Sequence, residues 1–123
     1  MVKLILLSVL AAVCLSSATV WAHSAGTPQH GGVVAAANEL EYELLAKPEV
    51  IRLYVRDHDK PVDISNASAR VTLLSGEAKQ DVELKPAGDK LEATGSFSAA
   101  PGTKAVVVII LKGKPLTARF TVK

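Results

Sequence analysis

Short stretches of alternating apolar and polar residues run from Val33 to Val122. This alternation is typical of half-buried β-strands. In the stretch 50–56, for example, Ile51, Leu53 and Val55 fall on one face. Turn-forming residues separate the stretches at intervals of about 8–12 residues, and no segment has a convincing helical period. The predicted strands are residues 33–37, 40–46, 50–56, 67–74, 81–85, 90–97, 104–111 and 116–122.

The strand pattern predicts an all-β fold in residues 33–123. We expect an antiparallel, immunoglobulin-like β-sandwich of about seven to eight strands. The apolar run from Ala105 to Leu111 has no polar residue in it. Such a run predicts a strand at the centre of the fold that is buried on both faces. Lys104 and Lys112 flank the run and oppose aggregation through it.

The stretch 40–46 also contains good helix formers, but its alternation favours a strand. Leu40, Tyr42 and Leu44 share one face of this strand. The glutamates of the segment, Glu41 and Glu43, occupy the opposite face together with the preceding Glu39. We expect this acidic face to be exposed to solvent. One of these three glutamates could serve as a carboxylate ligand if this face turns toward the N-terminal arm, and Glu41 is the preferred candidate.

The N-terminal residues have the layout of a secretory signal peptide. A positive start at residues 1–3 precedes an apolar run at residues 4–15 and a small-residue segment that ends at Ala22. The apolar run is too short to cross a bilayer of ~30 Å as a helix. We therefore predict a cleaved signal peptide (1–22), a flexible N-terminal arm (23–32) and one β-sandwich domain (33–123). The mature chain would be periplasmic, with no transmembrane segment.

Composition narrows the possible chemistry. The only cysteine of the 123 residues, Cys14, lies in the signal peptide, so the mature chain has no disulfide, thiolate metal site or cysteine nucleophile. A lipid on Cys14 is the alternative, although Val13 is larger than the residue such signals place there. Without Lys3 the formal net charge of +2 falls by one, and so weak a charge argues against a nucleic-acid partner. Nucleophile, phosphate-loop and metalloprotease motifs are missing, so we expect no enzyme.

The three histidines all fall in predicted loops, where binding residues concentrate. His23 would begin the mature chain, so its amino group and its ring could chelate one metal ion. His30 precedes Gly31 and Gly32, which can open space beside the ring. The third lies in the sequence Asp57-His58-Asp59, which offers an imidazole and carboxylates.

Each of these histidines also has an interpretation without a metal: a solvated arm for the first, a linker for the second and an ordinary turn for the third. The candidate metal ligands are therefore His23, His30, His58, Asp57 and Asp59. Nitrogen and oxygen donors of this kind favour Cu(II) over Zn(II).

Four segments, at residues 28–33, 42–44, 51–55 and 57–62, resemble a β-sandwich module of heavy-metal efflux systems. That module forms the N-terminal domain of their periplasmic adaptor (membrane fusion) subunits and also occurs as small free-standing periplasmic proteins. The resemblance implies that the protein handles Cu, Zn, Co or Ni ions, with His30 at the position that carries over and His58 as a further match. The mature chain has no Met, so it lacks the thioether ligands that Cu(I) prefers.

The predicted function is that of a periplasmic accessory or carrier that binds a divalent transition-metal ion and serves metal efflux or resistance. Its partners would be the metal ion and a metal efflux adaptor or other envelope protein. The alternative is a non-catalytic protein–protein interaction module without a metal, which would dock on an envelope complex by a sheet edge or face.

Processing of the chain can be checked directly. Because the small-residue segment ends at Ala22, the intact mass of the secreted protein is expected to correspond to residues 23–123. A mature form that begins at Cys14 and carries a lipid would contradict this prediction.

Overall fold

The protein is described by a computed structural model, in which residues 26–123 are placed. Residues 1–22, predicted as a signal peptide, and His23 lie outside the described residues. Among residues 26–123, none belongs to a helix with the length and hydropathy of a membrane span. The nine strands are β1 (Val33–Ala37), β2 (Leu40–Ala46), β3 (Val50–Asp57), β4 (Lys60–Pro61), β5 (Ser68–Ser75), β6 (Ala78–Ala87), β7 (Lys90–Thr94), β8 (Lys104–Leu111) and β9 (Lys114–Thr121).

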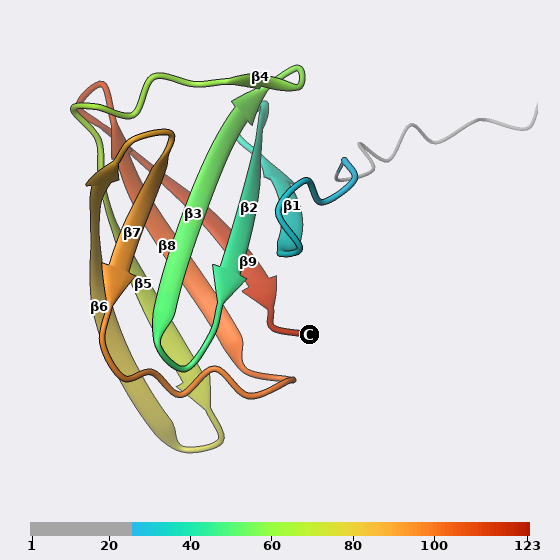
Figure 1. Ribbon diagram of the computed structural model, residues 1–123, viewed down its shortest axis with the longest axis vertical. Helices are drawn as coiled ribbons and strands as arrows, with labels where there is room; N and C mark the ends of the chain where they lie inside the picture. The colour runs from blue at the N-terminus through green and yellow to red at the C-terminus, as the bar shows by residue number, and fades with distance from the viewer. Residues whose placement is uncertain (1–25) are drawn as a thin grey trace, which may run out of the picture.

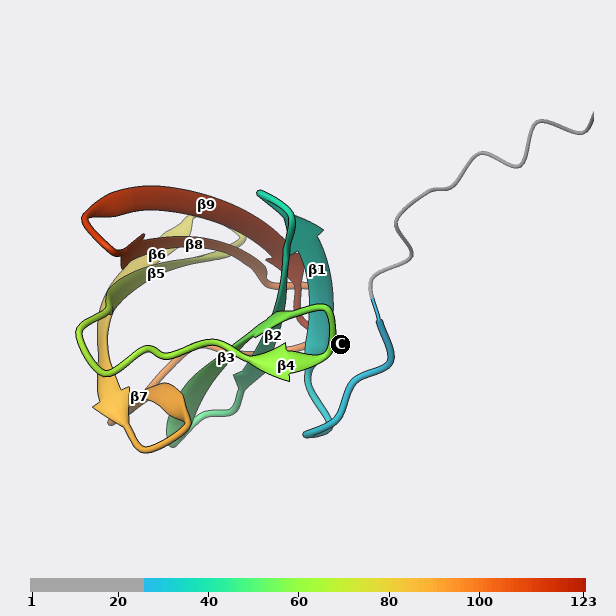
Figure 2. The ribbon, with the colours of Figure 1, turned by 90° about the horizontal axis from the view of Figure 1, so that it is seen from above.

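The strands form one antiparallel sheet that nearly closes into a barrel (Figures 1 and 2). Their order is β1-β2-β3-β7-β6-β5-β8-β9, with the short β4 paired to β3. Strands β5, β6, β7 and β8 make a Greek key. The first three are consecutive in the chain and adjacent in the sheet, and β8 returns to lie beside β5. The two ends of the order, β1 and β9, lie side by side. Asn38 Nδ2, in the β1–β2 turn, donates to the carbonyl oxygen of Thr117 in β9 at 3.3 Å.

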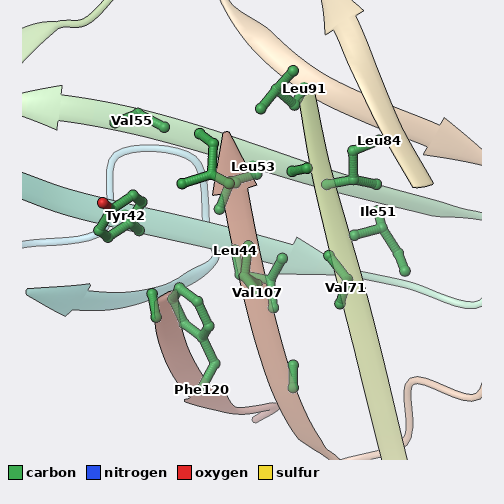
Figure 3. Close-up of a cluster of buried hydrophobic side chains, with 14 of the residues drawn as sticks. Tyr42, Leu44, Ile51, Leu53, Val55, Val71, Leu84, Leu91, Val107 and Phe120 are labelled. Carbon is green, nitrogen blue, oxygen red and sulfur yellow. The ribbon is translucent and has the colours of Figure 1, made fainter. Parts of the chain in front are cut away.

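Strand β6 joins the two walls of the barrel. Its residues up to Leu84 pair with β5, whereas those from Lys85 onward pair with β7. One wall therefore contains β1, β2, β3 and β7, and the other contains β5, β8 and β9 (Figure 2). The space between the walls is filled by aliphatic side chains and two aromatic ones, among them Tyr42, Leu53, Val71, Leu91, Val107 and Phe120 (Figure 3).

The all-β antiparallel class predicted from the alternation is confirmed, and so are the bounds of three strands, 33–37, 40–46 and 104–111. The predicted strand 90–97 ends earlier, at Thr94. Beyond that point the backbone N–H groups of Gly95 and Phe97 donate to the carbonyl oxygens of Glu49 and Pro48, at 3.2 and 2.8 Å. The chain thus leaves the ladder and follows the β2–β3 turn. The short strand β4 was not predicted, because two residues are too few for an alternating pattern.

The prediction that β8 is buried on both faces is wrong. Ala105, Val107, Ile109 and Leu111 are buried in the core, but the alternate residues are half-buried or, in the case of Ile110, 38% exposed. The strand does lie in the interior of the sheet, between β5 and β9. A sheet that curls around a single core gives each strand only one inner face. The outer face of β8 therefore carries apolar side chains that do not pack in the core.

Substitutions at two neighbouring valines of β8 test which face of the strand packs in the core. Val107→Asp would place an unpaired charge in a side-chain position that is 0% exposed, at a cost of several kcal/mol. That is a large part of the ~5–15 kcal/mol that stabilises a typical domain. Val108→Asp, the matched control on the outer face, is expected to cost about 1 kcal/mol or less. Urea unfolding midpoints measure both changes, and equal losses would show that the inner and outer faces of β8 are wrongly assigned.

Candidate functional site

The acidic face of β2 is not uniformly exposed, contrary to expectation. The side chain of Glu43 is 0% exposed, because residues 26–32 lie across it. Three backbone N–H groups donate to its carboxylate: that of Gln29 to Oε1 at 3.0 Å, and those of His30 and Gly32 to Oε2 at 2.8 and 2.9 Å. The ring of His30 adds a contact from Nδ1 to Oε1 at 3.2 Å. We call these four residues the Glu43 cluster.

The two glycines of the His-Gly-Gly sequence are required by this geometry. Gly31 has a φ of +77°, which side-chain-bearing residues rarely adopt. A Cβ atom on Gly32 would lie 2.5 Å from the carbonyl oxygen of Leu44, so the chain there approaches β2 more closely than any other residue allows. The turn directs successive N–H groups at one carboxylate, as in the backbone nests that bind anions.

The ring of His30 is held in one orientation. It stacks on Tyr54 of β3, with ring centroids 3.6 Å apart and planes 2° apart. An ionised carboxylate only accepts hydrogen bonds, so the contact with Glu43 assigns the proton of the neutral ring to Nδ1. Nε2 then carries the free lone pair. Within the described part of the chain Nε2 has no hydrogen-bond partner, and the side chain is 34% exposed. His30 therefore presents a partly exposed imidazole ring whose orientation is fixed.

A buried arginine balances the charge of the cluster. Arg56 of β3 is 3% exposed, and its Nη2 lies 3.9 Å from Oε1 of Glu43 and 3.7 Å from Oε2 of Glu41. The same nitrogen donates to the carbonyl oxygen of Thr27 at 3.5 Å. Arg56 thus holds the beginning of the described chain against β2 and β3, while its charge offsets that of the two glutamates.

Hydrogen bonding decides the ionisation of Glu43. Burial alone would raise the pKa of this carboxyl, but the backbone N–H groups of Gly32, Gln29 and His30, with the His30 ring, outweigh it and hold the pKa below its ordinary value. The ionised form is therefore the one that the fold stabilises.

Asp57 ends β3, and His58 and Asp59 form the β3–β4 turn, away from the Glu43 cluster. His58 and Asp59 both have positive φ, 50° and 65°, as a tight two-residue hairpin turn requires. The side chain of His58 is 91% exposed, and its Nδ1 contacts Oδ1 of Asp57 at 2.6 Å. His58 follows Tyr54, on which His30 stacks, by four residues, so its backbone lies roughly 13 Å further along the strand.

The predicted metal ligands are thus not gathered in one place by the part of the chain that is described. In residues 26–123 no three His, Cys, Asp or Glu side chains form a group able to hold a metal ion. His30 and His58 are separated along β3, the carboxylate of Glu41 lies near Arg56, and His23 lies outside the described residues. A metal site that includes His23 stays a prediction.

The sequence offers Glu43 only as one of three glutamates on a face expected to be exposed, and it does not single out Tyr54 or Arg56 as site residues. Glu43 stands directly opposite Tyr54 in the β2–β3 ladder, and Glu41 opposite Arg56. The one available signal was charge on the outward positions of two strands that follow the His-Gly-Gly sequence. That signal is weak, because outward charges ordinarily face solvent.

Comparisons of the chain with protein-family models, with curated proteins and with solved structures find no match. The chemistry of the Glu43 cluster is consequently the basis for a functional proposal.

Removal of the buried carboxylate charge is expected to loosen residues 29–32. Glu43→Gln leaves a neutral amide that accepts at one oxygen only, so at least one N–H donor loses its acceptor and the others lose a charged one. Hydrogen bonds to charged groups are worth about 1.5–3 kcal/mol, and we expect a loss of about 2 kcal/mol in the free energy of unfolding. Glu39→Gln, on an exposed turn residue, is the matched control and should cost almost nothing. Urea unfolding with hydrogen exchange at residues 29–32 distinguishes the two.

Acid should act through the same carboxylate. Because the folded-state pKa of Glu43 is lowered, its contribution to stability is fully present above the unfolded value of about 4.3. The contribution is lost as the pH falls through the folded-state pKa. The Glu43→Gln variant is expected to lose less stability than the wild type over this acid range, in the presence of a chelator. Parallel pH curves for the two proteins would show that Glu43 is not the group responsible.

Proposed function

We propose that the protein binds a divalent transition-metal ion through Nε2 of His30. The observation that carries this proposal is the contact between Nδ1 of His30 and the fully buried carboxylate of Glu43. Metal-binding histidines commonly donate their second ring N–H to a carboxylate, which fixes the tautomer and strengthens the ligand. Glu43 would orient the ring without touching the metal.

The stacked tyrosine supports the same role. Tyr54 is buried, and its ring lies parallel to that of His30. The imidazole is therefore held by a ring on one side and a carboxylate at one edge, so little rotational freedom is left for a metal ion to remove. An orientation fixed in advance lowers the entropic cost of binding.

The remaining ligands would come from residues before the described part of the chain. His23 precedes His30 by seven residues, and a segment of that length can span up to ~23 Å, which allows it to fold back toward the ring. If the mature chain begins at His23, its amino nitrogen and imidazole join His30 as nitrogen donors. Such a set favours Cu(II) over Zn(II). In this proposal His58 and its neighbouring aspartates form a turn and do not share the metal.

The wider role remains the one predicted from the sequence: a periplasmic carrier or accessory linked to metal efflux or resistance. The domain size, the two facing walls and the Greek key support the proposal that the sheet is a variant of the immunoglobulin-like sandwich. An ion held by one fixed histidine and a terminal segment would exchange readily, as a carrier requires.

Paired histidine substitutions test the ligand assignment. His30→Asn retains an N–H donor near the position of Nδ1 but has no Nε2, so it removes the ligand while keeping a partner for Glu43. We expect calorimetric titration with Cu(II) to show a loss of at least tenfold in affinity, or ~1.4 kcal/mol. His58→Asn, which tolerates the positive φ of the turn, is the control and should change the affinity little.

Two further measurements can contradict the proposal. One residue added before His23 would block the amino-terminal chelate, and we expect it to weaken binding at least tenfold in the mature protein. Affinity should fall as the pH falls through the imidazole range, since a protonated ring cannot bind a metal ion. Absence of any site tighter than roughly millimolar for Cu(II), Zn(II), Ni(II) and Co(II) would rule out the metal function. An equal loss in His58→Asn and His30→Asn would rule out the assignment to His30.

A further inference from the structure

Charge is distributed unequally along the chain. From Glu92 to Lys123 there is no further Asp or Glu, whereas five basic residues fall in this part: Lys104, Lys112, Lys114, Arg119 and Lys123. The segment 39–63 is the reverse, with seven acidic residues against four basic ones. The fold places these two parts in different walls, because the acidic segment forms β2, β3 and β4 and the basic one forms β8 and β9 (Figure 2).

The basic wall also carries the most exposed large apolar side chains among residues 26–123. These are Leu74 of β5, 39% exposed, and Ile110 of β8, 38% exposed. Val106 and Val108 lie on the same outer face as Ile110 and are half-buried. Together the three β8 residues form an apolar stripe along a strand whose outer face contributes nothing to the core.

Cationic side chains border this stripe. Arg119 of β9 stands directly opposite Val106, and Lys104 stands at one end of the stripe. The Nζ atom of Lys104 donates to Oγ1 of Thr121 at 2.8 Å, which holds the ammonium group over β9. Arg70 of β5, which faces Val108 from the other side, is paired with Glu83 and is not counted here. We call Lys104, Val106, Val108, Ile110 and Arg119 the β8–β9 outer face.

We propose that the β8–β9 outer face docks on a membrane surface that contains anionic phospholipid. Phosphate groups would pair with Lys104 and Arg119, while Val106, Val108 and Ile110 would contact the acyl-chain boundary. The acidic wall would then point away from the bilayer, so that the charge asymmetry of the molecule would orient it. Each Lys or Arg near an anionic membrane surface contributes to binding, and apolar contact adds to that attraction.

The composition of the face favours lipid over a protein partner. Protein interfaces are enriched in aromatic residues, but the face has no aromatic side chain. A symmetric dimer through this face is disfavoured because two basic faces would repel each other. An acidic protein partner is left as an outcome of the experiment.

Vesicle co-sedimentation at low salt tests the proposal with the protein as purified from cells that express the full chain. One set of vesicles is pure phosphatidylcholine, and the other contains phosphatidylcholine and phosphatidylglycerol in a three-to-one ratio. We expect binding to the anionic vesicles alone, and weakening as salt is added. Lys104→Glu/Arg119→Glu should lower the partition coefficient at least tenfold. Ile110→Ser should lower it several-fold without changing the salt dependence.

The matched control is Lys47→Glu/Lys60→Glu, which changes the net charge equally but in the acidic segment 39–63. This variant should bind nearly as well as the wild type, and circular dichroism should show that all variants fold. Equal losses in the two double variants would overturn the proposal, because net charge alone would then explain binding. Absence of binding to anionic vesicles, or equal binding to neutral ones, would also overturn it. Binding of polyglutamate through the same face, without binding to vesicles, would overturn it in favour of an acidic protein partner.

Discussion

The burial of one ionised carboxylate determines how the beginning of the described chain is arranged. Glu43 has no access to solvent, and a buried charge is costly unless hydrogen bonds and an opposite charge compensate for it. Compensation comes from the backbone of Gln29, His30 and Gly32, with Arg56 nearby. These residues therefore have to lie against β2 and β3. The position of the His30 ring, and with it the proposed metal ligand, follows from that requirement.

The outer faces of the two walls of the barrel differ in how far other residues of the chain cover them. The outer side of β2 and β3 is covered by residues 26–32, so that Glu43, Tyr54 and Arg56 are buried there. The outer side of β8 has no such cover from residues 26–123, and its apolar side chains stay partly exposed. Apolar side chains that lie together at a surface mark a candidate binding site. The cationic border of this patch makes an anionic surface its natural complement.

The two proposals concern separate parts of the molecule. The Glu43 cluster belongs to the wall of β2 and β3, and the β8–β9 outer face belongs to the other wall. Docking on a membrane would leave the imidazole of His30 on the side of the acidic wall. Under the two proposals together, the protein would stay near the membrane through one wall and bind the metal ion at the other. Each proposal can fail without the other.

The local sequence pattern was sufficient to predict where the strands lie, because the alternation of apolar and polar residues follows directly from the two-residue period of a β-strand. The bounds of β1, β2 and β8 follow from it. Alternation does not say what covers the outward residues. Glu43 and Val108 both point away from the core. Glu43 is fully buried by residues 29–32, which lie 11 to 14 positions earlier in the chain, whereas Val108 is only half-buried. The sequence offers both His30 and His58 as candidate ligands in predicted loops. Only the tertiary structure places His30 against a buried carboxylate and His58 in an exposed turn. The burial and the hydrogen-bond partners of a side chain depend on contacts between distant segments, and a local sequence pattern carries no information about such contacts.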